Sequence, residues 1–379
     1  MVREDLSDDG RKLLDLWSNG REEPKNIFKV YFKNEALNLK WAEMAGHLFF
    51  KNSLSSRLRE IIVLRITRRC RSDYEFINHL EIARDRGLMT EEEMLDLTRD
   101  QTTLSWPPEE KALIDATNEI AETTEVSDAT WTALNSAFDV RQLMDIVMTV
   151  GGYSLNSMAC NSLLVDIDPE HSRDHGLTPS YEGPVDIIRH ATRTATAARL
   201  ERLSFQNLDE DSERSVGHAL SETTEKNRVL TLAHHPLLLK DWSHISAYVE
   251  DKSGLSRADA DLIMLRAFWR YRVTYAFTHA AEKASARGLS RDLIDAVMEN
   301  PTAAAFDEKQ SLLVRAVDQL IDQIDIEDAV WNRMRTHFSE LDMMDIVFTC
   351  GNSYIKSIFL KTFRTQLEPD VPPYKGLEG

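Results

Sequence analysis

Apolar residues recur along the chain with the period of an α-helix. In residues 58–66 they occupy positions i, i+3 and i+4 and also the remaining faces, which predicts a helix that is buried nearly all round. Ser55 and Ser56 precede this run as candidate N-caps, and Gly87 lies where the next helix would end. No alternating stretch of strand length stands out. The sequence therefore predicts an all-α fold.

The chain also contains a long internal repeat. Residues 54–88 align with residues 255–289 at a constant offset of 201, and fourteen of the 35 pairs are identical, where chance would give about two. Downstream the offset becomes 200, and the run Met-Asp-Ile-Val at 144–147 recurs at 344–347. A period this long is too long for a solenoid and indicates a domain duplication.

The repeat sets the predicted domain boundaries. We predict one helical domain over 1–165, a connector over 166–215 and a second helical domain over 216–379. The first part of the connector is rich in Pro, Gly and Asp and is predicted to be irregular, whereas 184–204 is compatible with a helix.

Charge and cysteine usage exclude several function classes. The chain carries 63 acidic and 45 basic residues, a formal net charge of −18, and is a poor candidate for binding nucleic acid. No run reaches about 18 apolar residues, so we expect no membrane span, and the first residues lack the apolar core of a secretory signal. Cys70, Cys160 and Cys350 are far apart, which excludes a disulfide framework and a CxxC motif. We therefore expect a protein of a reducing, cytoplasmic compartment.

Three residues with acid–base side chains fall at spacings that can bring them together. Glu75 and His79 are four residues apart on one predicted helix, so their side chains meet on one face. Glu60 lies on the preceding, largely apolar helix, where a carboxylate is costly unless a partner meets it. Each feature alone is equally compatible with a structural ion pair. Together they can supply a general base, a general acid and an orienting group for proton transfer beside a carbonyl.

The order of these residues resembles a known family. The chain reads Arg59-Glu60, then an apolar helix, then Tyr-Glu-x-x-x-His ending at His79, then Gly87 eight residues later. This is similar to the carboxymuconolactone decarboxylase family, whose members share a fold with the alkyl-hydroperoxidase D proteins. The resemblance covers nearly all of 26–165 and, more weakly, 227–365. It implies two tandem alkyl-hydroperoxidase D-like helical domains that form an intramolecular pseudo-dimer, with further homo-oligomers as an option.

The resemblance and the residue chemistry together assign candidate roles. We expect Glu60, Glu75 and His79 to be catalytic, and the family is associated with cofactor-free reactions. Arg71, one turn before Glu75, and Arg59 are the candidates for binding a substrate carboxylate. No cofactor is expected. A metal held by the three catalytic candidates is disfavoured because no dense Asp/His cluster supports it, and other histidines such as those at 47, 234 and 235 stand isolated in sequence.

The residues of the second copy and the positions of the cysteines limit which reactions the chain can catalyse. Asp261, Ala276 and Ala280 stand where the first copy has its three candidates, so we expect the second copy to be a degenerate packing partner. The peroxidase branch of the family uses two cysteines, at positions that here are glutamate and arginine. Cys70 is adjacent to them and is expected near the pocket mouth, but Cys160 is 90 residues away.

The sequence thus predicts a cofactor-independent lyase or isomerase that acts on a small carbonyl, lactone or carboxylate compound. Decarboxylation, β-elimination and lactone conversion all fit this chemistry. Two alternatives stay open, a hydroperoxidase-like redox protein and a non-catalytic assembly or binding protein. The substrate itself depends on pocket residues that the pattern does not place.

Overall fold

The computed structural model describes residues 3–18, 20–21, 23–171, 197–204, 210–221 and 223–377, and every regular element in these ranges is helical. The predicted all-α fold is confirmed. In the first half the helices are η1 (Arg3–Asp5), α1 (Asp8–Ser18), α2 (Asn26–Tyr31), η2 (Phe32–Asn34), α3 (Glu35–Gly46), η3 (His47–Lys51), α4 (Ser56–Arg69), α5 (Asp73–Asp85), α6 (Glu91–Thr98), α7 (Pro108–Thr123), α8 (Asp128–Ala137) and α9 (Val140–Ser162). In the second half they are α10 (Glu210–Ser221), α11 (Lys226–Leu232), α12 (Pro236–Asp251), α13 (Arg257–Arg270), α14 (Thr274–Ala286), α15 (Arg291–Ala296), α16 (Glu308–Gln323), α17 (Asp328–Met334) and α18 (Glu340–Phe363).

Local sequence explains where the central helices begin and end. The Ser55 hydroxyl accepts the backbone N–H of Leu58 and caps α4, as its place before the apolar run predicts. Thr90 and Glu93 form a reciprocal capping box at the start of α6. Gly87 follows α5 with a φ of 59°, a left-handed conformation that glycine adopts at little steric cost. These signals fix the register of α4 and α5, the two helices that carry the catalytic candidates.

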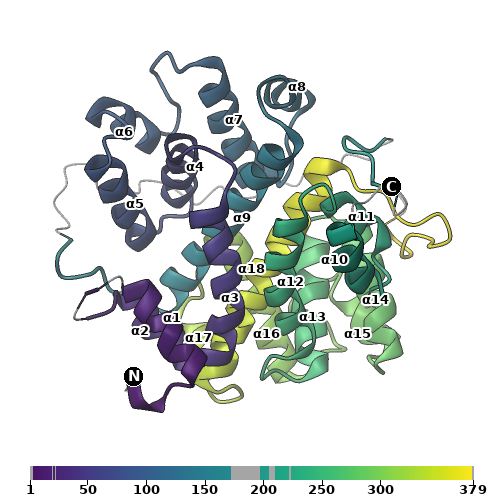
Figure 1. Cartoon of the computed structure of the whole chain (residues 1–379). Helices are drawn as coiled ribbons and strands as arrows, with labels where there is room; N and C mark the ends of the chain where they lie inside the picture. The colour runs from purple at the N-terminus through teal and green to yellow at the C-terminus, as the bar shows by residue number, and fades with distance from the viewer. Residues whose placement is uncertain are drawn as a thin grey trace.

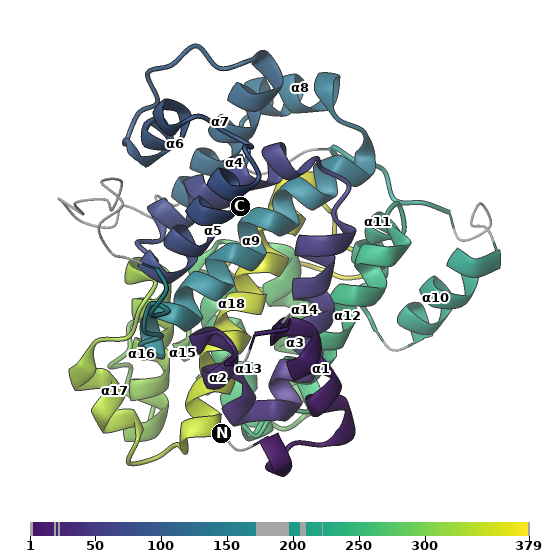
Figure 2. The same ribbon diagram turned by 60° about the vertical axis from the view of Figure 1, so that its left-hand side comes forward.

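The two longest helices, α9 and α18, pack against one another through the middle of the molecule (Figure 1). A Cβ atom on Gly351 of α18 would lie 2.5 Å from Leu155 Cγ of α9, so the close approach of the two helices requires a residue without a side chain. Helix α3 of the first half lies against α12 of the second, and Figure 2 shows the same arrangement from another side. One hydrophobic core contains residues of both halves. The halves therefore share a large common interface.

Equivalent helices surround this interface in each half. Helix α4 contacts α5, α7 and α9, and α13 contacts α14, α16 and α18 in the same way. The bounds of α4 and α13 differ by 201, the offset of the sequence repeat. This arrangement agrees with the predicted duplication, which the described helices do not by themselves establish.

The predicted connector lies largely outside the described residues. Within it, residues 197–204 form no helix, so the helical pattern at 184–204 does not hold over this part. Arg199 is instead anchored to both halves, because its backbone N–H donates to Phe363 O and its guanidinium pairs with Asp128 at 2.6 Å. The stretch therefore runs along the surface between α8 and the end of α18.

Among the described helices, none combines the length and the apolar character that a membrane crossing requires.

Candidate active site

The catalytic candidates of the first half come together around His79. Glu60 projects from α4 and His79 from α5, and the Nδ1 atom of His79 lies 2.6 Å from Glu60 Oε2. The Nε2 atom of the same ring lies 3.8 Å from Glu75 Oε2, one helical turn earlier on α5. Glu60 is fully buried, and Glu75 and His79 are each at most 6% exposed. The structure thus brings together the three residues that the sequence pattern singled out.

Arg59 is the partner that offsets the buried charge of Glu60. Its guanidinium donates to Glu60 Oε1 at 2.9 Å and 3.2 Å and to the backbone oxygen of Phe49 at 2.8 Å. The same guanidinium stacks over the Phe49 ring at 4.7 Å. Both carboxylate oxygens of Glu60 are therefore engaged, one by Arg59 and the other by His79. These contacts let Arg59 orient Glu60, and substrate binding by Arg59 stays a prediction.

Aromatic rings enclose the imidazole. The ring of Tyr153, from α9, meets that of His79 edge to face with centroids 4.8 Å apart. The Phe49 ring lies on another side, 6.3 Å from His79, and the Arg86 guanidinium lies 5.7 Å from the Phe49 centroid. Phe49 belongs to η3, a single turn of π-helix, a conformation that often occurs at functional sites. The surroundings of His79 are thus apolar, which strengthens its interactions with charged neighbours.

Glu75 lies between His79 and a thiol. The Sγ atom of Cys160, from α9, lies 3.6 Å from Glu75 Oε1 and is placed to donate a hydrogen bond to it. Lys25 reaches the same region from the segment before α2, where its ammonium donates to Asn78 Oδ1. The charge of Lys25 acts on Glu75 as well. Lys25 is therefore a cation beside the carboxyl group of Glu75.

The local environment shifts the pKa values of Glu60 and Glu75 in opposite directions. Burial opposes the ionisation of Glu60, yet the charges and hydrogen bonds of His79 and Arg59 outweigh it and hold the pKa of Glu60 below its usual value. Burial dominates at Glu75 and raises the pKa of that carboxyl group, against the opposing influence of His79, Cys160 and Lys25. Paired carboxyl groups whose pKa values are pushed apart are typical of sites that divide acid and base roles.

Residues 36–119 match the model of the Carboxymuconolactone decarboxylase family. This segment of the chain is therefore similar to members of the carboxymuconolactone decarboxylase family. The match runs from α3 into α7 and contains Arg59, Glu60, Arg71, Glu75 and His79. The match confirms the resemblance over these residues, and the resemblance of 227–365 stays a prediction.

Part of the chain also resembles a solved structure. One solved structure that resembles part of the chain is described as the alkylhydroperoxidase AhpD core, an uncharacterized peroxidase-related protein from Ralstonia eutropha JMP134. It shares 15% sequence identity, and the alignment covers 48% of this chain and 96% of that chain with a TM-score of 0.42. A TM-score this low supports no conclusion about chemistry. No curated protein matches the sequence.

Two residues of the matched segment, Arg71 and Cys70, follow directly after α4. Arg71 follows α4 in a left-handed conformation with a φ of 52°, and the aligned Arg272 repeats it with 55°. This shared backbone geometry gives Arg71 a structural role, and substrate binding by it stays a prediction. Cys70 was expected near a pocket mouth, but it is buried, with its thiol 3.9 Å from the hydroxyl of Ser154. Burial raises the pKa of Cys70 to about 12.

The second half holds an ionic network where the family domain has its acid–base residues. Asp261, at the position of Glu60, pairs with Arg287 at 2.9 Å. Lys356 is buried nearby, where its ammonium pairs with Glu225 and lies 3.7 Å from Glu250. With alanine at 276 and 280, this half has neither the second carboxylate nor the imidazole at the aligned positions. The residues present there form ion pairs with one another.

Several residues around the site carried no functional signal in the sequence. Tyr153 and Cys160 come from α9, about 80 residues after His79, and Phe49 and Lys25 come from segments before α4. An aromatic or a thiol on a buried helix is far more often a core residue, so only the folded chain shows that these side chains surround Glu75 and His79.

Proposed function

We propose that this chain is a cofactor-independent lyase or isomerase that acts on a small carbonyl, lactone or carboxylate compound. The observation that carries the proposal is the orientation of His79. Its Nδ1 atom faces Glu60 at 2.6 Å and its Nε2 atom faces Glu75. An ionised Glu60 accepts the Nδ1–H bond, which leaves the Nε2 lone pair free to take a proton.

The proposed roles follow from the two environments. His79 Nε2 is the general base, and it removes a proton next to the substrate carbonyl, so that the C–H electron pair forms an enolate. Glu60 holds the imidazole in place and stabilises the imidazolium that forms, while Arg59 keeps Glu60 ionised. Glu75, whose pKa burial raises, is the general acid that returns a proton to the enolate carbon or oxygen. In decarboxylation the C–C pair would form the enolate instead, and Glu75 would protonate it.

A cation near the acid suits an anionic substrate. Lys25 lies close enough for its charge to act on Glu75, and burial together with Arg21 lowers the pKa of its ammonium. We propose that Lys25 binds a substrate carboxylate, a role that the sequence reading gave to Arg71 and Arg59. Lys25→Met should then raise KM more than it lowers kcat, while Lys29→Met, at a part-buried lysine of α2 that pairs with Glu23 at 3.2 Å, should change neither.

The test is proton transfer on small probes. The protein would be incubated in D₂O with 2-oxo acids, 3-oxo acids and unsaturated γ-lactones, and deuterium uptake or CO₂ release followed by NMR. Turnover by the native protein that is lost in His79→Gln and kept in His337→Gln, an exposed histidine, supports the proposal. Turnover that survives His79→Gln would contradict it, and no turnover of any probe would favour the non-catalytic assembly alternative.

The contact between Cys160 and Glu75 is the observation that favours the alternative of a redox protein. A carboxylate 3.6 Å from a thiol can accept its proton, and the resulting thiolate could reduce a peroxide to water or an alcohol while becoming a sulfenic acid. A thiol reductant must then restore it. Burial and the charge of Glu75 raise the pKa of Cys160, which disfavours the thiolate. Thiol-dependent peroxide consumption that is lost in Cys160→Ser and kept in Cys350→Ser would support this alternative.

We also propose that 1–165 and 216–379 are tandem copies that pack as a pseudo-dimer, with the second copy contributing surface rather than turnover. The long contact of α9 with α18 and the ionic network around Lys356 support this division of roles. Restoring both Ala276→Glu and Ala280→His should not create a second active site, because Lys356 and its partners are buried where the first copy has apolar and aromatic groups.

A reducing, cytoplasmic setting remains part of the proposal. Cys70, Cys160 and Cys350 are all buried and form no disulfide with one another. Their burial means that thiol oxidation would have to disturb the core.

A further inference from the structure

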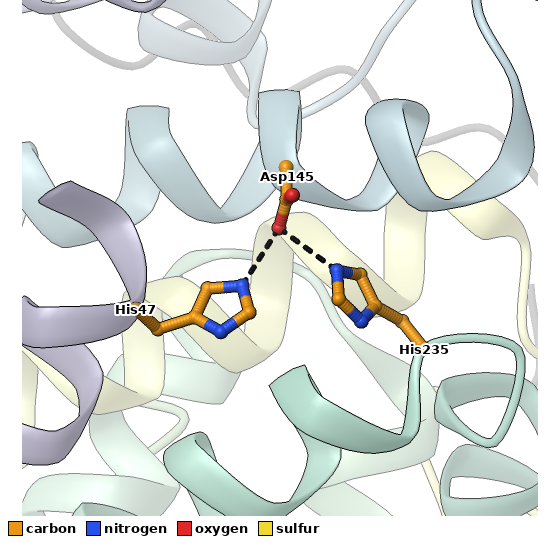
Figure 3. Close-up of side chains that lie close together, drawn as sticks. All are labelled: His47, Asp145 and His235. Carbon is orange, nitrogen blue, oxygen red and sulfur yellow. Dashed lines mark hydrogen bonds and ion pairs between the residues drawn. The ribbon is translucent and has the colours of Figure 1, made fainter. Parts of the chain in front are cut away.

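Two histidines that stand 188 residues apart in sequence meet at one carboxylate on the interface between the halves. Asp145 of α9 directs its Oδ1 atom toward His47 Nε2 at 2.9 Å and toward His235 Nε2 at 3.3 Å (Figure 3). His47 begins η3 in the first half, and His235 precedes α12 in the second. All three side chains are buried. Sequence analysis had treated these histidines as isolated.

The separations match those of ligands around one ion. Donor atoms about 2.0–2.1 Å from a tetrahedral metal are about 3.3 Å from one another. The three candidate atoms all lie within 4.8 Å of one another, and the two contacts to Asp145 Oδ1 are 2.9 Å and 3.3 Å. The other oxygen, Asp145 Oδ2, accepts the N–H and the hydroxyl of Ser53, each at 2.7 Å, which orients the carboxylate. Two imidazoles and one carboxylate are therefore already arranged as a ligand set.

His47 lies between two carboxylates. Its Nδ1 atom lies 3.1 Å from Asp241 Oδ2, and its Nε2 atom faces Asp145 Oδ1. A neutral imidazole carries only one ring proton, so donation to Asp241 leaves a lone pair against a carboxylate oxygen. A metal between Nε2 and Asp145 converts this repulsion into coordination. A carboxylate on the far nitrogen of a ligating histidine is also the usual outer partner in metal sites.

Two buried atoms near the cluster have incomplete hydrogen bonding, although His235 Nε2 lies 3.3 Å from Asp145 Oδ1. The Nε2 atom of His235 and the Oδ1 atom of Asp241 make no hydrogen bond of acceptable geometry with the residues that the structure describes. Both side chains are more than nine-tenths buried. Buried polar atoms without partners are rare and costly, and a bound ion is one of the few explanations for a pair of them.

The equivalent carboxylate in the second half shows what a purely structural arrangement needs. Asp345 Oδ1 accepts hydrogen bonds from Tyr248 and Asn34, each at 3.0 Å, and Oδ2 accepts the Gly254 N–H at 2.7 Å. At the repeat offset, Tyr248 corresponds to His47 and Asn34 corresponds to His235. Three neutral donors therefore reach this carboxylate, two of them from the positions that correspond to the histidines. Around Asp145, the positions that correspond to Tyr248 and Asn34 are both histidines. An imidazole can bind a metal ion, whereas the tyrosine hydroxyl and the asparagine amide serve around Asp345 as hydrogen-bond donors.

We propose that His47, Asp145 and His235 bind one divalent transition-metal ion of the Zn²⁺ type across the interface of the two halves. His47 and His235 ligate through Nε2 and Asp145 through Oδ1, with water completing the coordination. Imidazole and carboxylate ligands favour such an ion over Mg²⁺ or Ca²⁺, which prefer oxygen ligands throughout. The site is separate from the Glu60–His79 pair, and η3 connects the two, because His47 and Phe49 belong to the same turn.

The neighbouring charges are compatible with one added cation. Asp145 and Asp241 bring two carboxylates, and the charge nearest to them is Lys51, whose ammonium lies 3.0 Å from Asp241 Oδ2 and 3.9 Å from Glu43. Metal binding would break one weak hydrogen bond. His235 Nδ1 accepts the Leu238 N–H at 3.4 Å, and this nitrogen must carry the ring proton once Nε2 ligates the metal. A bond this long is easily given up for coordination.

The test is metal binding by the full chain. Protein freed of metal with a chelator would be titrated with Zn²⁺ by calorimetry and with Co²⁺ by visible absorption, and its thermal midpoint followed. We expect saturation at one ion per chain, a tetrahedral Co²⁺ spectrum and a midpoint that rises by a few degrees with excess Zn²⁺. The decisive variant is His235→Asn, which copies the Asn34 arrangement of the second half and should keep the fold while weakening Zn²⁺ at least about 100-fold.

Matched variants separate this site from incidental binding. His337→Asn removes an exposed histidine and should leave the titration unchanged. If His235→Asn bound Zn²⁺ as tightly as the native chain, the assignment would be wrong. It would be equally wrong if the native chain took up no stoichiometric metal and NMR showed a doubly protonated His47 between Asp145 and Asp241, because a proton would then supply the cation.

Discussion

The Nδ1 atom of His79 lies 2.6 Å from Glu60 Oε2, and this contact joins two consecutive buried helices. Glu60 in turn is held by Arg59 from its own helix. A fully buried carboxylate would be costly if it stood alone, so the two partners explain how it is tolerated. The same pairing fixes which nitrogen of His79 can accept a proton.

Substitution of His79 should remove turnover without unfolding the protein. We expect His79→Ala to lower kcat by at least about 100-fold, the usual contribution of a general acid–base group, with little change in thermal midpoint. Glu60→Gln should act through His79, lowering kcat by at least about tenfold with a smaller effect on KM. Steady-state kinetics beside a thermal melt measures both, and near-normal kcat in His79→Ala would remove it from the mechanism.

Glu75 should leave a signature in the pH dependence of stability. Its pKa is raised in the folded protein, so its contribution to stability is complete below the unfolded value of about 4.5 and is lost as the pH rises through the folded pKa. Glu75→Gln carries no such loss. Between pH 4 and 8, the thermal midpoint of Glu75→Gln should therefore rise relative to that of the native protein as the pH rises.

Glu60 supplies the opposite control for that experiment. Its pKa is lowered by His79 and Arg59 against the effect of burial, so its contribution is present above about pH 4.5 and is lost as the pH falls through the lower folded value. Glu60→Gln should accordingly destabilise the protein at neutral pH and matter less in acid. Parallel pH profiles for the two variants would contradict the assigned environments.

The cysteines should be dispensable for the main activity. Cys70 is buried with a raised pKa, and Cys160 touches Glu75 through a thiol that burial keeps protonated. We expect Cys70→Ser and Cys160→Ser each to retain turnover within about threefold, less than 1 kcal/mol in barrier. A loss as large as that of His79→Ala, or a Cys70–Cys160 disulfide detected by mass spectrometry during turnover, would favour the redox alternative.

The interface between α9 and α18 should be sensitive to a single methyl group. A Cβ on Gly351 would lie 2.5 Å from Leu155 Cγ, whereas a Cβ on Gly46, at the end of α3, would meet nothing within 4 Å. Gly351→Ala should lower the free energy of unfolding by about 1–3 kcal/mol, and Gly46→Ala should be neutral or slightly stabilising. Denaturant unfolding of the two variants measures the difference.

Residues 1–178 alone should not behave as the full chain does. Separation from α18 would expose the apolar face of α9 that surrounds Leu155, and would remove His235 from Asp145. We expect this fragment to self-associate or precipitate and to lose most of its activity, as judged by size-exclusion chromatography and turnover. A monodisperse, fully active fragment would show that the second half is not needed as a packing partner.

The sequence by itself determined the helical class and predicted the repeat and the three catalytic candidates. Helical periodicity and capping residues such as Ser55 act locally, so they can be recognised without knowing the rest of the fold. Glu75 and His79 are four residues apart, and that spacing alone places them on one face. The family spacing then added Glu60, and the structure places all three together.

Only the tertiary structure decided which distant residues complete the site. Arg59 is a candidate substrate ligand from the sequence, and the structure shows that its guanidinium is engaged by Glu60 and the Phe49 carbonyl. Cys160 reaches Glu75 because α9 packs across α5, a contact that no local pattern encodes.

The histidine cluster shows the same limit most plainly. His47 and His235 belong to different halves and meet only because α3 packs against α12, which brings both imidazoles to Asp145. In sequence His47 stands alone and His235 has only His234 beside it, so neither shows a metal-binding spacing. Their chemistry arises from long-range packing, whose geometry is set by the sum of many apolar contacts rather than by the residues that it brings together.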